Sequence, residues 1–101
     1  MICNNKILEL KPTTQFRRDF KKLSQSDISE LSDVLKLLQM EIPLPEKYKK
    51  HNLKGNFRGV IDIHIKPDLV LLYEIYIIEE SVKVLSLIRI GNHATLFKKK
   101  K

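Results

Sequence analysis

The chain is poor in the features that mark several large classes of protein. It has 101 residues and a single cysteine, Cys3, so no disulfide can form within it, which fits a reducing cytosol. Its longest apolar stretch, Leu69 to Ile78, is interrupted by Glu74 and is far shorter than the roughly 20 residues that a membrane-spanning helix needs. Residues 1–11 lack the continuous apolar core of a signal peptide. The sequence therefore predicts a cytoplasmic protein with no membrane partner.

Charge is unbalanced towards the positive. Lysine and arginine total 19 against 12 acidic residues, a net charge of +7. We predict one domain over residues 1–97 and a lysine tail over residues 98–101, which carries four of those charges and leaves +3 on the domain. Such a basic domain favours a polyanionic partner, either nucleic acid or an acidic protein. Two basic clusters remain within it: Arg17, Arg18, Lys21 and Lys22, and then Lys47, Lys49, Lys50 and Lys54.

The first half of the chain predicts one strand and two helices. Residues 7–10 form the expected strand, and Thr13 or Thr14 can cap the helix that follows. A second helix is expected from Asp27, which resembles the start of a capping box, to about Met40. Apolar residues recur at helical spacing through both helices: Phe16, Phe20 and Leu23, then Ile28, Leu31, Val34, Leu35 and Leu38.

The second half predicts a sheet. After a polar loop over residues 46–56, strands are expected over residues 57–65, 69–77 and 82–90, and a short closing segment over residues 93–97. Tight turns join these three strands, so we predict antiparallel pairing with the apolar 69–77 strand in the centre. The predicted fold class is α+β, in the order β-α-α-β-β-β, with the two helices packed on one face of a twisted antiparallel sheet.

Three histidines, a carboxylate and an arginine are expected to meet at one rim of this sheet. His51 precedes the first long strand, His64 ends that strand, and Asp68 begins the next. Arg89 ends the last strand and His93 follows it. Histidine titrates near neutral pH, with a free pKa of about 6.5, and arginine binds phosphate oxygens in a bidentate manner. These residues can move protons and hold a phosphate, which suits an RNA-cutting enzyme that works without a metal.

Each member of this set also has an ordinary structural explanation. His51 can be an incidental surface residue, His64 can simply pair with Asp62 or Asp68, and Arg89 can be a solvated charge. The three histidines are 13 and 29 residues apart, with no short paired-ligand spacing and no cysteine partners. We therefore expect no metal and no cofactor.

Three segments carry a family resemblance. They are Tyr48 to Gly55, His64 to Leu69, and Arg89 to Phe97, in that order. Together they resemble the YafQ branch of the RelE/ParE superfamily of toxin–antitoxin toxins, from about Leu8 to Phe97. The chain departs from the family at Leu69, where some members carry an aromatic residue that could stack on a base.

This resemblance implies a ribosome-dependent messenger-RNA endonuclease that a cognate antitoxin holds inactive. By motif position, the acid–base residues would be His51, His64, Asp68 and His93, with His93 favoured as the acid and Asp68 or His64 as the base. Arg89 would bind the phosphate. Substrate binding would fall to Lys50, Lys54 and Phe97.

Two other functions remain open. A ParE-like toxin that inhibits DNA gyrase would use the same fold but needs no histidine cluster. A basic nucleic-acid-binding module would rely on charge alone, with an affinity that falls steeply with salt. For the toxin, the expected partners are the ribosome, messenger RNA and an acidic, partly helical antitoxin that wraps the surface near residues 17–22, the active-site rim, or both. Operator DNA would be bound only through the antitoxin complex.

Overall fold

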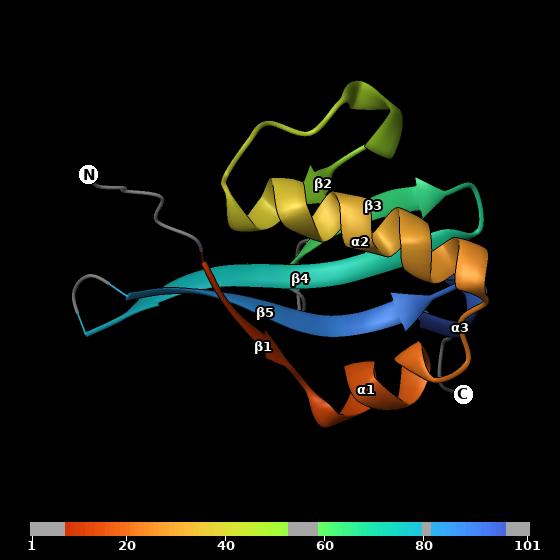
Figure 1. Cartoon of the computed structure of the whole chain (residues 1–101), viewed down its shortest axis with the longest axis horizontal. Helices are drawn as coiled ribbons and strands as arrows, with labels where there is room; N and C mark the ends of the chain where they lie inside the picture. Colours follow the sequence, from red (N-terminus) through yellow and green to blue (C-terminus); the bar gives the residue numbers. More distant parts are fainter. Residues whose placement is uncertain (1–7, 53–58, 80–81, 97–101) are drawn as a thin grey trace.

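The computed structural model describes residues 8–52, 59–79 and 82–96, leaving aside the side chains of His93 and Thr95. It confirms the α+β class and the order of the long elements (Figure 1). None of the helices within these ranges is long and apolar enough to cross a membrane. The elements are β1 (Glu9–Pro12), α1 (Thr14–Phe20), α2 (Gln25–Gln39), the 3₁₀ helix η1 (Glu46–Tyr48), β2 (His51–Asn52), β3 (Ile61–Lys66), β4 (Leu69–Ile78), β5 (Val82–Gly91) and α3 (His93–Leu96).

The described strands form one sheet in the order β1-β5-β4-β3-β2. Pairing is antiparallel throughout except between β1 and β5, which run parallel. The sheet is therefore mixed, whereas the sequence predicted an antiparallel one. Tight turns determine how β3, β4 and β5 pair, but two helices separate β1 from them and leave its direction open. The central place of β4 is confirmed.

Helices α1 and α2 pack on one face of the sheet (Figure 1). The predicted alternation in β3 is confirmed, because Ile61, Ile63 and Ile65 belong to this core and Asp62 and His64 alternate with them. A smaller cluster covers the opposite face, where α3 packs through Leu96. The main core comprises Leu8, Phe16, Leu31, Val34, Leu38, Tyr48, Ile63, Ile65, Leu69, Leu71, Tyr73, Leu85, Leu87 and Ile90.

Helix α1 begins just after β1 ends, and it packs against β5. Thr13 is its N-cap, as predicted, with its Oγ1 accepting a hydrogen bond from Phe16 N at 3.0 Å. The backbone N–H of Thr13 donates to Leu87 O at 3.0 Å, and its hydroxyl donates to Ile88 O at 2.8 Å. One threonine thus starts the helix and anchors it to the strand.

Helix α2 begins two residues before the predicted start. Its N-cap is Ser24, whose Oγ accepts a hydrogen bond from Asp27 N at 3.1 Å, and its first helical residue is Gln25. The prediction that Asp27 starts the helix was wrong because Asp27 sits within the first turn, three residues after the cap. A carboxylate in the first turn still stabilises the helix, because its negative charge interacts favourably with the positive N-terminal end of the helix dipole.

The segment predicted as a loop over residues 46–56 contains η1 and β2. Tyr48 of η1 is buried in the main core, and β2 pairs His51 with Asp62 of β3. His51 therefore lies on a short edge strand rather than on a free loop. Residues 53–58 lie outside the described ranges.

A bulge changes the orientation of the end of β5. Tyr73 pairs with Leu87 but Leu72 pairs with Arg89, so Ile88 is the extra residue. Simple alternation would place Arg89 on the core face with Leu87. Instead Ile90 fills that place, at 1% exposed, and Arg89 lies opposite Leu72.

Candidate active site

Strand pairing brings two of the three histidines together. His51 pairs directly with Asp62, and His64 follows Asp62 by two residues, so all three side chains share a face. The rings of His51 and His64 meet edge to face with their centroids 6.3 Å apart. This face is the one that α3 covers, and it lies opposite the face on which α1 and α2 pack.

Asp62 is a buried carboxylate between these histidines. Its side chain is 7% exposed, whereas that of His51 is 63% exposed. Asp62 Oδ1 lies 3.4 Å from His51 Nδ1, within ion-pair range, yet it accepts no hydrogen bond among the described residues. A buried acceptor without a hydrogen bond is costly, so this oxygen favours a cationic or hydrogen-bond-donating partner.

Arg89 is held by Asp19 of α1. Its Nε and Nη2 donate to the two carboxylate oxygens of Asp19 at 2.8 and 3.0 Å, and Ile90 N donates to the same carboxylate at 3.0 Å. Burial raises the pKa of Asp19, but the hydrogen bonds from Arg89 and Ile90 outweigh it and lower the pKa below 3.8. The bond to Asp19 raises the pKa of Arg89. The guanidinium is therefore fixed in direction and remains charged.

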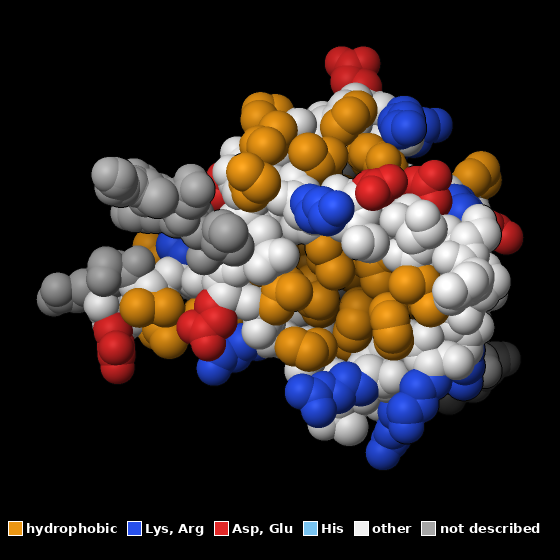
Figure 2. Space-filling view, viewed as in Figure 1, with side chains coloured by type: hydrophobic (Ala, Val, Ile, Leu, Met, Phe, Trp, Pro, Cys, Tyr) orange, Lys and Arg blue, Asp and Glu red, His pale blue; other side chains and the backbone are white. Residues whose placement is uncertain are grey.

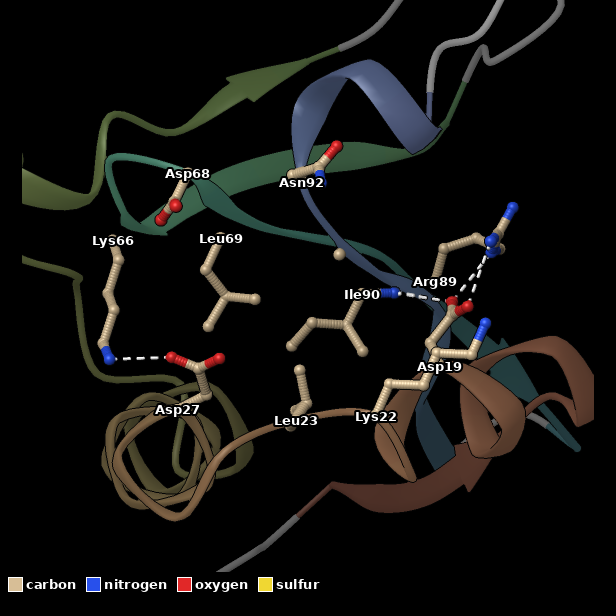
Figure 3. Close-up of a pocket in the computed structure, with 11 residues that line it drawn as sticks. Asp19, Lys22, Leu23, Asp27, Lys66, Asp68, Leu69, Arg89, Ile90 and Asn92 are labelled. Atoms are coloured by element: carbon tan, nitrogen blue, oxygen red, sulfur yellow. Dashed lines mark hydrogen bonds and ion pairs between the residues drawn. The ribbon is translucent and has the colours of Figure 1, made fainter.

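A pocket of about 540 Å³ at the rim of the sheet contains both Asp68 and Arg89 (Figure 3). It lies between the helices and the strand ends, with Lys22 at one side. At the other side, Lys66 Nζ donates to Asp27 Oδ1 at 2.7 Å, and this bond lowers the pKa of Asp27. The pocket thus combines carboxylates and cations, and its floor includes Leu69.

The structure groups the predicted residues into two sets. His51 and His64 meet on the α3 face, and Asp68 and Arg89 line the rim pocket. The sets are adjacent, because Asp62, Leu72 and Arg89 are aligned across β3, β4 and β5. Strands two apart in a sheet are separated by roughly 10 Å.

The remaining predicted residues bear on the site less directly. His93 begins α3 immediately beyond β5, but its side chain is not described. Lys50 is exposed beside His51. Lys54, Phe97 and the lysine tail lie outside the described ranges.

Sequence reasoning missed Asp19 and the role of Asp62. Asp19 is the one acidic residue among the basic residues of α1, which is a signal that it serves a specific partner. The expectation of no metal rested on the spacing of the histidines along the chain and on the lack of cysteine partners. Pairing between β2 and β3 makes residues that are 11 positions apart, His51 and Asp62, direct neighbours.

The chain is similar to known proteins over nearly its whole length. Residues 8–98 match the family described as bacterial toxin of type II toxin–antitoxin system, YafQ. The mRNA interferase toxin YafQ of Escherichia coli K12 is 37% identical over 87 residues, which are 82% of this chain and 88% of that protein.

Solved structures show the same fold. A metal-bound toxin from Helicobacter pylori is 36% identical, with a TM-score of 0.77, over 90% of this chain and 100% of the other. The toxin of the E. coli DinJ–YafQ complex is 34% identical, with a TM-score of 0.72, over 89% of this chain and 98% of the other.

Proposed function

The chain belongs to the YafQ family of bacterial toxins of type II toxin–antitoxin systems, and from that premise we propose that it is an endoribonuclease that cleaves messenger RNA on the ribosome. The observation that most supports this proposal is the meeting of His51 and His64 beside a rim pocket that contains Asp68 and Arg89. A gyrase inhibitor or a module that binds nucleic acid by charge alone would need no such set.

The proposed reaction is an in-line attack by the ribose 2′-OH on the adjacent phosphorus. Asp68 or His64 takes the 2′-OH proton, and His93 gives a proton to the departing 5′ oxygen. Each positioned acid or base typically contributes about 10²–10⁴ in rate. The products are a 2′,3′-cyclic phosphate and a 5′-OH. Side chains supply both proton transfers, so this mechanism needs no metal.

Arg89 is the proposed phosphate ligand. Arginine has five N–H donors, of which two serve Asp19 here, so the guanidinium retains donors for a phosphate oxygen while Asp19 holds its direction. A guanidinium that is already fixed in place stabilises the extra negative charge of the transition state without further reorganisation. We therefore assign Asp19 a positioning role.

An acidic, partly helical antitoxin segment is the proposed partner. Between α2 and the β1–α1 region lies an apolar groove, visible in Figure 2 with basic side chains along its margin. Phe20 and Leu10 within it are 37% and 36% exposed. Arg17, Lys21 and Lys36 at its margins are complementary to acidic residues. An amphipathic helix with acidic flanks would match both properties.

A translation reaction with purified components tests the proposed function. Wild-type chain should cut a reporter messenger RNA at discrete positions, mapped by primer extension, and cutting should require ribosomes. DNA gyrase supercoiling should be unaffected in a parallel reaction. Intact RNA together with lost supercoiling would favour the ParE-like alternative, and salt-sensitive RNA binding without cleavage would favour the binding module.

A further inference from the structure

We propose that a second copy of this chain docks on the outer part of the β4–β5 hairpin and forms a weak, two-fold symmetric homodimer. The contact is antiparallel strand pairing between β4 of one copy and β4 of the other, over Ile75 to Ile78. The rim pocket lies at the start of β4 and the hairpin tip lies at its far end. The dimer therefore forms independently of the proposed RNA cleavage.

The β4–β5 hairpin extends beyond the rest of the sheet, towards the left of Figure 1. Strand β4 pairs with β5 along its whole length, but its pairing with β3 ends where Tyr73 meets Ile61. Gly59, with a φ of +90°, lies in a turn just before β3. Within the ranges that the structure describes, Ile75 to Ile78 therefore have β5 on one side and no strand on the other.

This free edge lacks the usual protection against pairing. An edge strand exposes unpaired backbone N–H and C=O groups, and proteins commonly protect it with a charged side chain, a proline or a bulge. The run from Ile75 to Ile78 has no charge and no proline, and the β5 bulge at Ile88 lies far from it. On the β5 side, Lys83 forms an ion pair with Glu41 at 2.9 Å, and β1 begins to pair at the next residue. The β4 edge is thus the one that is open to a partner strand.

The side chains of the hairpin tip are apolar on both faces. Among the described residues, five of the nine large hydrophobic side chains that are exposed belong to this tip, at 36–58% exposed. They are Ile75, Tyr76, Ile77, Ile78 and Val82. Successive residues of β4 alternate between the two faces. At about 200 Å² for a fully exposed side chain of this size, the five present about 400 Å² of apolar surface. An apolar patch of that size on a monomer is often a functional contact.

An identical strand matches this edge better than a charged partner does. Antiparallel pairing about a two-fold axis sets the same edge of each copy against the other, so their N–H and C=O groups satisfy one another. The side chains that then lie opposite one another come from one uncharged segment, and apolar groups meet apolar groups. An acidic or basic partner would find no opposite charge on Ile75 to Ile78.

Area and net charge determine how strong the association can be. Two tips bring together up to about 800 Å² of apolar surface, below the roughly 1,200 Å² at the lower end of stable interfaces, so the dimer is weak and reversible. Each copy carries a net charge of +7, so the copies repel one another at low salt. Added salt screens this repulsion and should strengthen the dimer. Binding to an acidic partner would weaken with salt instead.

Analytical ultracentrifugation of the purified full-length chain tests the dimer. The average mass should rise with protein concentration from that of one chain towards that of two, and more steeply at high salt. Ile77→Glu and Ile77→Lys should each weaken self-association at least about tenfold, because like charges meet near the two-fold axis. Met40→Glu places the same charge on a residue that is 51% exposed at the end of α2, and it should associate like wild type.

A mixture of the two Ile77 variants provides the sharper test. Equal amounts of Ile77→Glu and Ile77→Lys should recover at least about tenfold in association over either variant alone, because opposite charges then meet across the axis. Ile77 is 58% exposed, so both variants should keep the urea midpoint of wild type. A wild-type chain that stays monomeric at every concentration, or assembles beyond two copies, would overturn the dimer. Variants that associate like wild type, or a mixture without recovery, would overturn the β4 contact.

Discussion

Asp19 accepts hydrogen bonds from three N–H groups, two on Arg89 and one on the backbone of β5. Its side chain is 10% exposed, so these bonds form in partial isolation from water. The one carboxylate therefore orients the proposed phosphate ligand and binds the N–H of Ile90. A residue with both tasks should affect stability as well as catalysis.

Asp19→Asn should lower the free energy of unfolding by about 1–3 kcal/mol at pH 7, because it weakens bonds made to a charged group. Urea denaturation would measure this change. The same substitution at exposed Asp33 should stay within about 0.5 kcal/mol. Equal stability of Asp19→Asn and wild type would show that the ion pair contributes nothing net.

Acid should remove the difference in unfolding free energy between wild type and Asp19→Asn. The folded-state pKa of Asp19 lies below its ordinary value of 3.8, so the carboxylate stabilises the fold fully above pH 3.8. Its contribution is lost as the pH falls through the lowered value. Urea midpoints of wild type and Asp19→Asn should therefore converge below pH 3.8. A gap of constant size from pH 7 to pH 3 would contradict the lowered pKa.

Among the elements, α1 is joined to β5 by a side chain at its start. Thr13 caps the helix and hydrogen-bonds β5 just beyond the end of β1. The helix has only seven residues, too few to be stable by itself. Its position therefore relies on this anchor, together with Phe16 in the core and the bonds of Asp19 to β5.

Thr13→Ala should cost about 1–2 kcal/mol of unfolding free energy, because both the cap and the bond to Ile88 O are lost. Thr13→Ser retains the hydroxyl and should recover most of that loss. Thermal or urea unfolding of the two variants provides the comparison. If serine is as destabilising as alanine, the hydroxyl is not the cause.

The elements also show where sequence patterns suffice. Period-two alternation around Ile61, Ile63 and Ile65 identified the face of β3 that packs on the helices, because apolar side chains line that face and polar ones alternate with them. The bulge at Ile88 was not predicted, because it shifts the alternation only at the end of β5, where Arg89 has an apolar neighbour on each side. The β2 strand was missed because two residues are too short to show a period.

On the scale of the whole molecule, the proposed surfaces lie on different sides of the sheet. The cluster of His51, Asp62 and His64 lies on the face that α3 covers. The apolar groove lies on the opposite side, between α2 and the β1–α1 region. An antitoxin on the groove would leave the histidines uncovered unless a second segment reached them. Substitution in the groove should therefore separate partner binding from catalysis.

Phe20→Glu should weaken antitoxin binding at least about tenfold, because it puts a negative charge where an acidic, apolar partner is expected. RNA cleavage should be retained. Ile77→Glu makes the same change at a residue that is 58% exposed and outside the groove, and should bind like wild type. Calorimetry with the purified antitoxin would compare them. Equal affinities of Phe20→Glu and wild type for the antitoxin would show that the groove is not the antitoxin-binding surface.

The site could be inferred from the sequence only in outline. The order of the strands correctly placed Asp68 and Arg89 at one rim. That Arg89 turns to Asp19 could not be predicted, because the two residues are 70 positions apart in the chain and only packing brings them together. The same holds for the burial of Asp62, which depends on how β2 closes the edge of the sheet.

The most direct test is the single-turnover rate of messenger-RNA cleavage by His64→Ala and His93→Ala, with Asp33→Ala as the control. If these imidazoles transfer protons, each substitution should slow cleavage by at least about 100-fold while the control cuts like wild type. Rates within a few-fold of wild type for both histidine variants, in folded protein, would contradict the account.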